Sequence, residues 1–442
     1  MEVILENTLT YLIVAVLILS VLYAYLKVHS SQSKKTKEKI KKAEEFGFHE
    51  PVSLHPVINE DICIGSGACV VACPEKDILG LVNGKGRTIN ASHCVGHGAC
   101  FHACPVEAIT LVMGTEKRGV ELPHISSDYE TNIKGIYIAG ELGGMGLIKN
   151  AIEQGKKAVD NIMKSIDDKG SAKYDLIIIG AGPAGIAATL RAAERNLKFL
   201  TIEQETIGGT VFSFPRSKVV MTSPVEIPLY GKIKLHETNK SELISLWTEI
   251  LQKNRITINE NEKINEIVKH QDYFEVISNQ DKYTAKRVLL AIGRRGSPRK
   301  LGVPGEGKEK VYYKLLEPEL IHNKKILVVG GGDSAIESAL LLAEEGNEVT
   351  LSYLGDSFKR IKPKNFKKIE DAIKLKLVNV LFNSNVKEIF DKKVVLTFQN
   401  GTEAEIENDL VYVFIGGELP NKFLEKIGIK ITKKFGEAVL KH

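Results

Sequence analysis

All six cysteines of this 442-residue chain lie between residues 63 and 104. They form two copies of the pattern C-x5-C-x3-C-P, and the second copy begins 31 positions after the first. The cysteines are Cys63, Cys69 and Cys73, then Cys94, Cys100 and Cys104. Thiolates are the soft ligands that iron–sulfur clusters require, and the surrounding glycines let backbone N–H groups point at a cluster. Zinc is disfavoured because its sites usually pair cysteines as C-x2-4-C, and disulfides are disfavoured in a reducing compartment.

The stretch from 55 to 113 resembles the bacterial dicluster ferredoxins, in which the last cysteine of each run binds the other cluster. The resemblance implies two clusters. One would take Cys63, Cys69 and Cys104, and the other would take Cys94, Cys100 and Cys73.

The two runs depart from that family at their second cysteine, which is replaced by Ser66 in the first copy and by His97 in the second. Each cluster is therefore left with three cysteines. Either both clusters contain three irons, or they contain four irons and the fourth is bound by Ser66, His97 or solvent. His97 is equally consistent with a solvated loop histidine, and His93 and His102 are interpreted as bystanders.

A glycine-rich loop follows the short apolar run at 174–179 and precedes a helical pattern that continues through Arg195. Its spacing is G-x-G-x-x-G, and Glu203 ends the next predicted strand, where an acid that binds ribose is expected. We interpret this loop as the adenosine site of FAD. Its residues are Gly180, Gly182, Pro183, Ala184 and Gly185.

A second loop of this kind follows the apolar strand at 326–329, about 150 residues after the first. Alanine in the third glycine position is allowed by the fingerprint. The pair of loops predicts a flavin domain and a nicotinamide domain. The residues of the second loop are Gly330, Gly332, Asp333, Ser334 and Ala335.

Residues 119–442 resemble the thioredoxin-reductase-like flavoproteins. The resemblance implies a loop beside the flavin, two returns between the domains, and a closing flavin motif at 131–141 in which an acid reaches the ribityl chain. The loop beside the flavin corresponds to Gly208, Gly209 and Thr210, and the two connections between the domains contain Gly293 and Gly416. The closing motif contains Gly140 and Glu141, with Glu141 in place of the usual aspartate.

The closing motif precedes the FAD loop here, whereas in the family it follows the nicotinamide domain. The reductase part is therefore predicted to be circularly permuted, which is reasonable where chain ends lie close together on a surface. The family's redox-active cysteine pair is missing, because no cysteine follows Cys104. Hydride transfer between nicotinamide and flavin, followed by single-electron transfer to the clusters, is the chemistry that remains. No residue is assigned a catalytic role.

The N-terminal segment from Leu9 to Leu26 is uncharged and long enough to cross a bilayer. Several lysines follow this segment in the sequence. By the positive-inside rule, we expect a single-pass anchor with the bulk of the chain on the cytoplasmic side. A signal peptide is disfavoured because Glu2 and Glu6 precede the apolar run. The net charge of +5 is concentrated in that lysine-rich segment, which argues against nucleic acid as a partner.

The expected fold class is α/β, with two Rossmann-like domains for FAD and NAD(P), a small α+β dicluster ferredoxin domain and an N-terminal transmembrane helix. The expected segments are a tail at 1–8, a transmembrane helix at 9–26, a basic linker at 27–54, the ferredoxin domain at 55–114, the FAD domain at 115–303 and the NAD(P) domain at 304–442.

The function expected from these parts is an NAD(P)H-dependent reductase that passes electrons through FAD and two iron–sulfur clusters to an acceptor. The expected partner is a redox protein in the membrane or cytoplasm, as electron acceptor or donor. NADPH is slightly favoured over NADH, because Lys359, Arg360 and Lys362 could meet a 2′-phosphate and no acid ends the strand at 348–352. A homodimer is compatible with the sequence. Two other functions stay open: a redox sensor without sustained turnover, and a dithiol-free reductase of a small-molecule disulfide.

Overall fold

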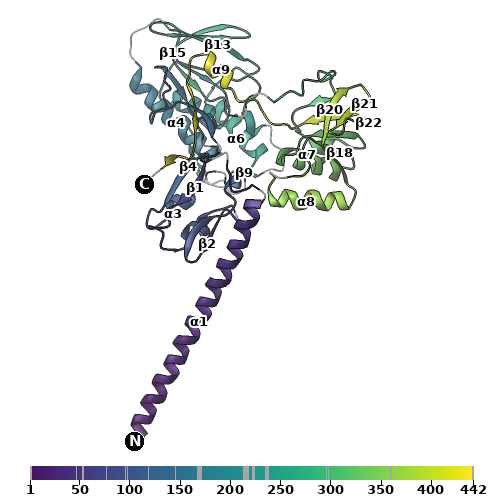
Figure 1. Cartoon of the computed structure of the whole chain (residues 1–442). Helices are drawn as coiled ribbons and strands as arrows, with labels where there is room; N and C mark the ends of the chain where they lie inside the picture. Colours follow the sequence, from purple (N-terminus) through teal and green to yellow (C-terminus); the bar gives the residue numbers. More distant parts are fainter. Residues whose placement is uncertain are drawn as a thin grey trace. The chain divides into compact units, whose positions relative to one another are not determined.

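The computed structural model describes most of the chain, and its contacts divide the chain into two compact units. Unit 1 comprises Met1–Val120 with Lys434–His442, and unit 2 comprises Glu121–Lys433 (Figure 1). The described residues are 2–45, 47–51, 54–75, 77–94, 96, 98–117, 119–144, 146–166, 172–212, 219–221, 224–233, 238–294, 296, 298–358 and 361–440.

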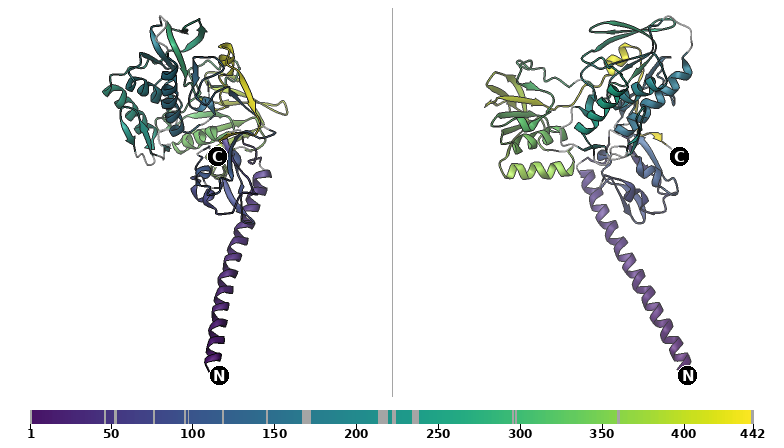
Figure 2. Two further views of the ribbon diagram at one scale, coloured as in Figure 1. Left: turned by 90° about the vertical axis from the view of Figure 1, so that its left-hand side faces the viewer. Right: turned by 180° about the vertical axis from the view of Figure 1, so that it is seen from behind.

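Unit 1 begins with one uninterrupted helix, α1 (Glu2–Glu45), which stands out in all three views (Figures 1 and 2). It is long and apolar enough to cross a membrane by length and composition. Its C-terminal part packs on the rest of unit 1, where Thr36 and Ala43 are buried and Ser33 Oγ lies 3.0 Å from the Asn83 amide that donates to it. The segment expected as a linker at 27–54 is thus helical as far as residue 45.

The cysteine-bearing part of unit 1 repeats the same local structure twice. In each copy, two left-handed glycines lead into a short helix, with φ of 72° at both Gly65 and Gly67 and of 76° and 73° at Gly96 and Gly98. The short helices are α2 (Ala68–Ala72) and α3 (Ala99–Ala103). Strand β1 (Leu54–Ile58) pairs antiparallel with β4 (Ile109–Met113), and β2 (Leu79–Val82) forms a hairpin with β3 (Lys85–Thr88).

The end of the chain returns to unit 1. Strand β25 (Glu437–Leu440) pairs antiparallel with β4, so the sheet order is β1-β4-β25. The predicted NAD(P) domain extended to residue 442, and the structure differs from that boundary here. Pairing of strands this far apart in the chain is decided by tertiary context, so the local sequence pattern did not indicate it.

The first half of unit 2 contains a six-stranded sheet in the order β13-β14-β15-β7-β8, with β6 beside β15. Strands β6, β15, β7 and β8 run parallel, and helices α4 and α5 pack together against them. Strand β15 pairs with β6 between Val288 and Leu290, which places the predicted closing flavin motif in the sheet of the FAD loop. The elements are β6 (Ile136–Ile138), α4 (Ile148–Ser165), β7 (Tyr174–Ile179), α5 (Pro183–Glu194), β8 (Phe199–Ile202), α6 (Lys240–Lys253), β13 (Ile264–Lys269), β14 (Phe274–Ser278) and β15 (Lys282–Leu290).

The second half of unit 2 contains a five-stranded parallel sheet in the order β16-β23-β17-β18-β19. The antiparallel sheet β20-β21-β22 lies between β19 and β23 in the chain. The elements are β16 (Val311–Tyr312), β17 (Lys325–Val329), α7 (Asp333–Glu344), β18 (Glu348–Tyr353), α8 (Pro363–Lys374), β19 (Val378–Phe382), β20 (Ser384–Ile389), β21 (Lys393–Phe398), β22 (Glu403–Glu407) and β23 (Leu410–Val413). The parallel strands of the first sheet and the parallel second sheet confirm the α/β class with two Rossmann-like parts.

The segment after β23 leaves the second sheet. Helix α9 (Asn421–Lys426) contributes Leu424, and the residue Ile429 beyond it joins the same core, which also holds Ile136, Ile177 and Val288 of the first sheet. Strand β24 (Ile431–Lys434) then pairs with β5 (Val120–Pro123). Helix α9 and strand β24, which the prediction assigned to the NAD(P) domain, therefore pack with the FAD-type half of unit 2.

Deletion of residues 437–442 is expected to destabilise unit 1 selectively. Loss of the β25 hydrogen bonds should lower its unfolding free energy by roughly 2 kcal/mol, which corresponds to a fall of about 10 °C in Tm. Thermal unfolding followed together with iron and flavin content would test this, because iron should be lost while flavin is retained. The control is Lys434→Ala, which removes only the surface ion pair to Glu437 and should leave Tm unchanged. Equal loss of flavin and iron in the deletion would contradict the pairing as described.

Candidate functional site

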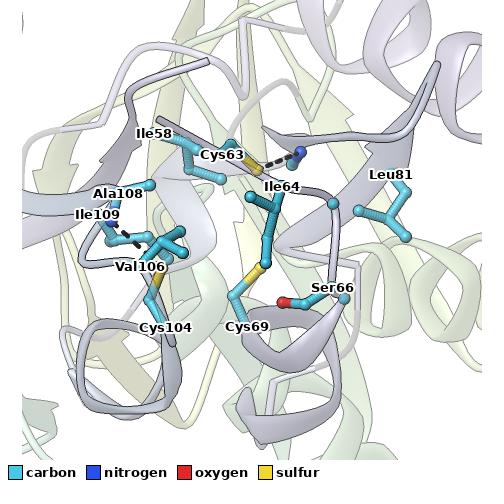
Figure 3. Close-up of a pocket in the computed structure, with 13 residues that line it drawn as sticks. Ile58, Cys63, Ile64, Ser66, Cys69, Leu81, Cys104, Val106, Ala108 and Ile109 are labelled. Atoms are coloured by element: carbon cyan, nitrogen blue, oxygen red, sulfur yellow. Dashed lines mark hydrogen bonds between the residues drawn. The ribbon is translucent and has the colours of Figure 1, made fainter. Parts of the chain in front are cut away.

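Two cysteines of the first run and one of the second line one pocket of unit 1 (Figure 3). Cys63 follows β1, Cys69 lies on α2 and Cys104 ends α3. Two backbone amides donate to their sulfurs, from Gly86 to Cys63 Sγ at 3.3 Å and from Ala108 to Cys104 Sγ at 3.2 Å. The remaining wall is apolar apart from Ser66. The rest of the lining is Ile58, Ile64, Gly65, Gly67, Leu81, Gly86, Val106, Ala108 and Ile109.

The other three cysteines line a second pocket. Cys94, Cys100 and Cys73 surround it, and the Gly96 amide donates to Cys94 Sγ at 3.4 Å. The pKa of Cys100 is raised to about 12 by burial, with smaller contributions from Cys94 and Cys73. Burial is also the largest cause of the raised pKa values of Cys69, Cys73 and Cys94. Ligation by iron would therefore have to displace protons from these thiols.

Each pocket thus takes two cysteines from one run and the last cysteine from the other, as the resemblance to dicluster ferredoxins implied. Among the described residues, no three histidine, cysteine, aspartate or glutamate side chains are close enough to hold a single metal ion. A cluster spreads its protein ligands over several irons, so the wider cysteine triads suit a cluster better than one ion. Three thiols, amide donors to sulfur and apolar walls together fit an iron–sulfur cluster in each pocket.

The corners without cysteine differ between the pockets. Ser66 lines the first pocket, where its Oγ accepts from the Ala68 amide at 3.5 Å. His97 lies outside the described residues. His93 and His102 line neither pocket, and the His93 ring packs against Phe48 with centroids 4.7 Å apart.

Sequence reasoning missed Glu75, which lines the second pocket. Its charge contributes to the raised pKa values of Cys73 and Cys94, after burial. Its backbone carbonyl accepts from Cys73 Sγ at 3.2 Å. The only sequence signal was its position directly after Cys73 and Pro74.

The first glycine loop of unit 2 has the geometry that a bound pyrophosphate requires. A Cβ at Gly180 would lie 2.5 Å from the Ala291 carbonyl oxygen, and one at Gly185 would lie 1.8 Å from the Gly180 oxygen. A Cβ at Gly182 would meet nothing within 4 Å. Gly180 and Gly185 are therefore needed for close backbone packing, whereas Gly182 borders open space at the start of α5, which begins with Pro183 and the buried Ala184.

Glu203 lies directly after β8 and turns its buried carboxylate back to this loop. Its Oε2 accepts from the Ala181 amide at 2.6 Å and its Oε1 from the Glu205 amide at 3.0 Å. Burial raises the pKa of the Glu203 carboxyl, although these hydrogen bonds oppose the shift. This position at the end of the second strand is the one expected for a ribose-binding acid.

The other predicted flavin-side residues gather around the same loop. A Cβ at Gly140 would lie 3.0 Å from Ala184 Cβ, and a Cβ at Gly209 would lie 3.3 Å from Gly182 Cα. The Gly208 amide donates to the Ala181 carbonyl at 2.9 Å, and Thr210 follows in the same turn, η3 (Gly209–Val211). These residues and the neighbouring Glu141 therefore surround the loop in a way that suits FAD binding.

Glu141 opens the short turn η2 (Glu141–Gly143) and interacts electrostatically with Arg294, which sequence reasoning missed. Burial lowers the pKa of the Arg294 guanidinium, and the charges of Glu141 and Glu121 oppose that shift. Gly293 precedes Arg294 and begins one of the two connecting segments. These segments meet where the Arg299 amide donates to the Gly416 carbonyl at 3.0 Å.

The second glycine loop repeats the first in the five-stranded sheet. A Cβ at Gly330 would lie 2.4 Å from the Phe414 oxygen, whereas a Cβ at Gly332 would meet nothing within 4 Å. Ala335 is fully buried on α7 and Ser334 is exposed in its first turn. Asp333 Oδ1 accepts from the Lys362 amide at 2.9 Å and from Asn365 Nδ2 at 2.7 Å, so its described hydrogen bonds join α7 to α8.

Tyr353 is a further residue that sequence reasoning missed. Strand β18 extends to Tyr353, one residue beyond the predicted end. A Cβ at Gly331 would lie 2.2 Å from the Tyr353 ring and one at Gly355 would lie 2.7 Å from it, so the ring stands between these glycines. An aromatic ring therefore occupies the strand end where the adenosine ribose of a dinucleotide is recognised. Lys359 and Arg360 lie outside the described residues.

Valine substitutions at the two open glycines are expected to separate the two nucleotide sites. Gly182→Val should lower FAD affinity by roughly 100-fold, because the side chain would fill the space where the pyrophosphate approaches. Gly332→Val should retain FAD and lose its reduction by NAD(P)H. Flavin absorbance of the purified protein and its bleaching by NADPH would measure both effects. Gly307→Val is the control, since a Cβ there also meets nothing within 4 Å, and it should leave both properties unchanged. Retention of FAD by Gly182→Val would contradict the assignment.

Comparison with known proteins agrees with both parts of the chain. Residues 177–441 match the family described as pyridine nucleotide-disulphide oxidoreductase, and residues 55–105 match the 4Fe-4S dicluster domain. The first match covers more than half of the chain. These matches confirm the expected cofactors, which are FAD, NAD(P)H and two iron–sulfur clusters. Of the two cluster types left open by the sequence, the dicluster match implies 4Fe-4S.

Individual relatives resemble the reductase part. The chain is 30% identical to a ferredoxin–NADP reductase of Ignicoccus hospitalis over 270 residues, which cover 59% of this chain and 83% of the relative. It is 27% identical to bacilliredoxin reductase Bdr of Bacillus subtilis over 265 residues, or 59% of this chain and 82% of the relative. Among solved structures, bacillithiol disulfide reductase Bdr (YpdA) from Staphylococcus aureus matches with a TM-score of 0.51 and 25% identity, covering 59% of this chain and 82% of that one.

The two glycine loops, the two cysteine pockets and these matches lead to one conclusion. The chain belongs to the pyridine nucleotide-disulphide oxidoreductase family, as an FAD-dependent NAD(P)H oxidoreductase that carries a 4Fe-4S dicluster domain.

Proposed function

We propose that this protein passes electrons from NAD(P)H through FAD and its two iron–sulfur clusters to a redox partner at a membrane. The observation that carries the proposal is that the chain combines two nucleotide loops and two cysteine pockets but has no cysteine after Cys104. An enzyme dithiol is therefore unavailable as an electron acceptor. The clusters are the remaining route that the chain itself provides.

The residues that would hold the flavin are those that lie around the first glycine loop. Gly182 would leave space for the pyrophosphate, and Glu203 would bind the ribose. Bound FAD supplies the conversion between the two-electron chemistry of nicotinamide and single-electron transfer. The protein contributes the backbone amides of the loop, the start of α5 and the acidic side chains Glu203 and Glu141. Gly332 and Tyr353 would border the nicotinamide dinucleotide.

Membrane attachment is supported by α1. The described residues from Tyr11 to Val28 are predominantly apolar and exposed within the chain, and lysines follow them on the same helix. By the positive-inside rule, the lysines after the apolar run support a cytoplasmic location for the bulk of the chain. Because α1 also packs on β2, the ferredoxin part would be held close to the membrane surface, which favours an acceptor in or on the membrane.

A preference for NADPH over NADH remains part of the proposal. Strand β18 does not end in an acid that could bind a 2′-hydroxyl, because Tyr353 is its last residue and Leu354 directly follows it. The named ferredoxin–NADP reductase relative favours the same nucleotide.

A second candidate function is reduction of a small-molecule disulfide without an enzyme dithiol. The relatives and the solved structure named bacilliredoxin or bacillithiol disulfide reductase favour it. Those matches cover the reductase part and leave the role of the cysteine pockets unexplained. The first candidate uses both parts of the chain and is therefore preferred.

The two functions can be separated with the double variant Cys63→Ala and Cys94→Ala, which removes one ligand from each pocket. In the full chain, NADPH should bleach the flavin of wild type and variant alike, whereas transfer to oxidised cytochrome c should fall by at least about tenfold in the variant. Turnover of a small-molecule disulfide that survives in the variant would support the second candidate. Flavin reduction too slow to sustain turnover in the wild type would contradict both and favour a redox sensor.

Membrane attachment can be tested with charges in the apolar half of α1. Leu17→Arg with Leu19→Arg should release the protein from membranes, because each arginine near the centre of a spanning helix costs about 3 kcal/mol of insertion free energy. Glu38→Arg with Glu44→Arg adds the same residues outside the apolar run and should leave the protein membrane-bound. Alkaline carbonate extraction of isolated membranes would measure the distribution. Release of the wild type by carbonate would overturn the anchor.

A further inference from the structure

The first cysteine pocket has one donor side chain that is not a cysteine. Of the residues that line it, Cys63, Cys69 and Cys104 carry sulfur, Ser66 carries a hydroxyl, and the others are glycine or apolar. A four-iron cluster needs a ligand for each of its irons, and the three thiolates can serve only three. Ser66 is therefore the single protein group of this lining that can face the fourth iron.

The backbone holds Ser66 in this place. It lies between Gly65 and Gly67, both with φ of 72°, and a Cβ at Gly65 would lie 1.8 Å from the Gly84 carbonyl oxygen. The loop is thus pressed against the β2–β3 turn. In Figure 3 the Ser66 hydroxyl points toward the side of the pocket where Cys69 lies.

The same residue is open to solvent. Ser66 is exposed, as is its neighbour Ile64 at 65% of its surface. Its one described hydrogen bond is the long contact of 3.5 Å from the Ala68 amide, so the hydroxyl is not committed to the protein. A neutral oxygen is a much weaker ligand for iron in a sulfide cluster than a thiolate. The fourth iron position beside Ser66 would therefore be accessible to solvent, and its iron would be weakly bound.

We infer that the first pocket contains an exchangeable site for a ferrous ion, which is the fourth iron of its cluster, with Ser66 Oγ as the protein donor. With a one-electron oxidant such as ferricyanide, a four-iron cluster with two ferric and two ferrous ions would give one electron to the oxidant and release one ferrous ion. Three ferric irons and the four sulfides would remain. Return of that electron restores one ferrous ion in the three-iron cluster. A ferrous ion can then re-enter without a further electron.

The inference depends on the 4Fe-4S dicluster domain and not on the proposed electron route. Its readouts are iron content and the EPR signal of three-iron clusters, so failure of electron transfer from NADPH would leave it standing. The second pocket also has three cysteines, together with Glu75, and can contribute its own three-iron signal. The comparison of variants at Ser66 is therefore the deciding measurement.

The experiment uses the full chain, purified anaerobically in detergent. Ferricyanide is added as the oxidant, excess reagent and released iron are removed, and dithionite with ferrous ammonium sulfate then restores the site. In the wild type we expect the first pocket to lose about one iron per chain, with a matching three-iron EPR signal that disappears on restoration. Ser66→Cys completes the thiolate set, so it should retain this iron and show about one three-iron spin per chain fewer than the wild type.

Val71→Cys is the matched control. It adds a thiol to α2 at a side chain that is 87% exposed and does not line the pocket, so it should behave like the wild type. Equal signals from wild type and Ser66→Cys, or the same protection in Val71→Cys, would overturn the inference. The absence of any three-iron signal in the oxidised wild type would also overturn it.

Ser66→Ala provides a second measurement if Ser66→Cys does not assemble. This change removes only an exposed hydroxyl with one long hydrogen bond, so the fold should persist. The dissociation constant for ferrous ion in the oxidised and re-reduced protein should rise by about tenfold. An unchanged dissociation constant would show that the Ser66 hydroxyl is not a donor.

Discussion

The exchange of Cys73 and Cys104 between the two cysteine runs is the constraint on which unit 1 depends. Each pocket is completed by the last cysteine of the other copy, so neither copy can form its site alone. The exchange requires α2 and α3 to end close to the loop of the other copy, so that the cysteine after each helix enters the other pocket. The pairing of β1 with β4 supports that arrangement. Left-handed glycines before both short helices give the two halves the same local geometry. The symmetry of the sequence repeat therefore becomes a symmetry of the two pockets.

Unit 2 is organised around one strand in a comparable way. Strand β15 pairs with β7 on one side and with β6 on the other, although β6 comes from a segment that precedes the FAD loop in the chain. This pairing brings Gly140 against Ala184 at the start of α5. Chain order can be permuted without loss of the site, because strand pairing and close packing depend on position in space and not on order in the sequence. The segment predicted to be the closing flavin motif thus precedes the FAD loop in the chain and lies in the same sheet.

The two cysteine pockets are not equivalent despite their common origin in a repeat. The first has the neutral Ser66 at its open corner, whereas the charge of Glu75 lies beside the second. A negative charge close to a cluster favours its more oxidised state, so the two pockets present different electrostatic surroundings to bound clusters. Such a difference gives two chemically similar centres distinct properties within one small unit. It arises from single residues in otherwise parallel loops.

The sequence by itself determined the parts of this protein. The cysteine spacing, the two glycine fingerprints and Glu203 depend on local patterns of a few residues, and each lies where its pattern predicted. Tertiary structure decided the rest: the return of α9 to the first sheet of unit 2, the pairing of β25 with β4, the place of the Tyr353 ring beside Gly331, and the approach of Glu75 to a pocket. These features depend on contacts between residues far apart in the chain or on the direction of a side chain. Neither kind of contact leaves a periodic or spaced signal in the sequence, because it depends on tertiary context and not on the local pattern of residues.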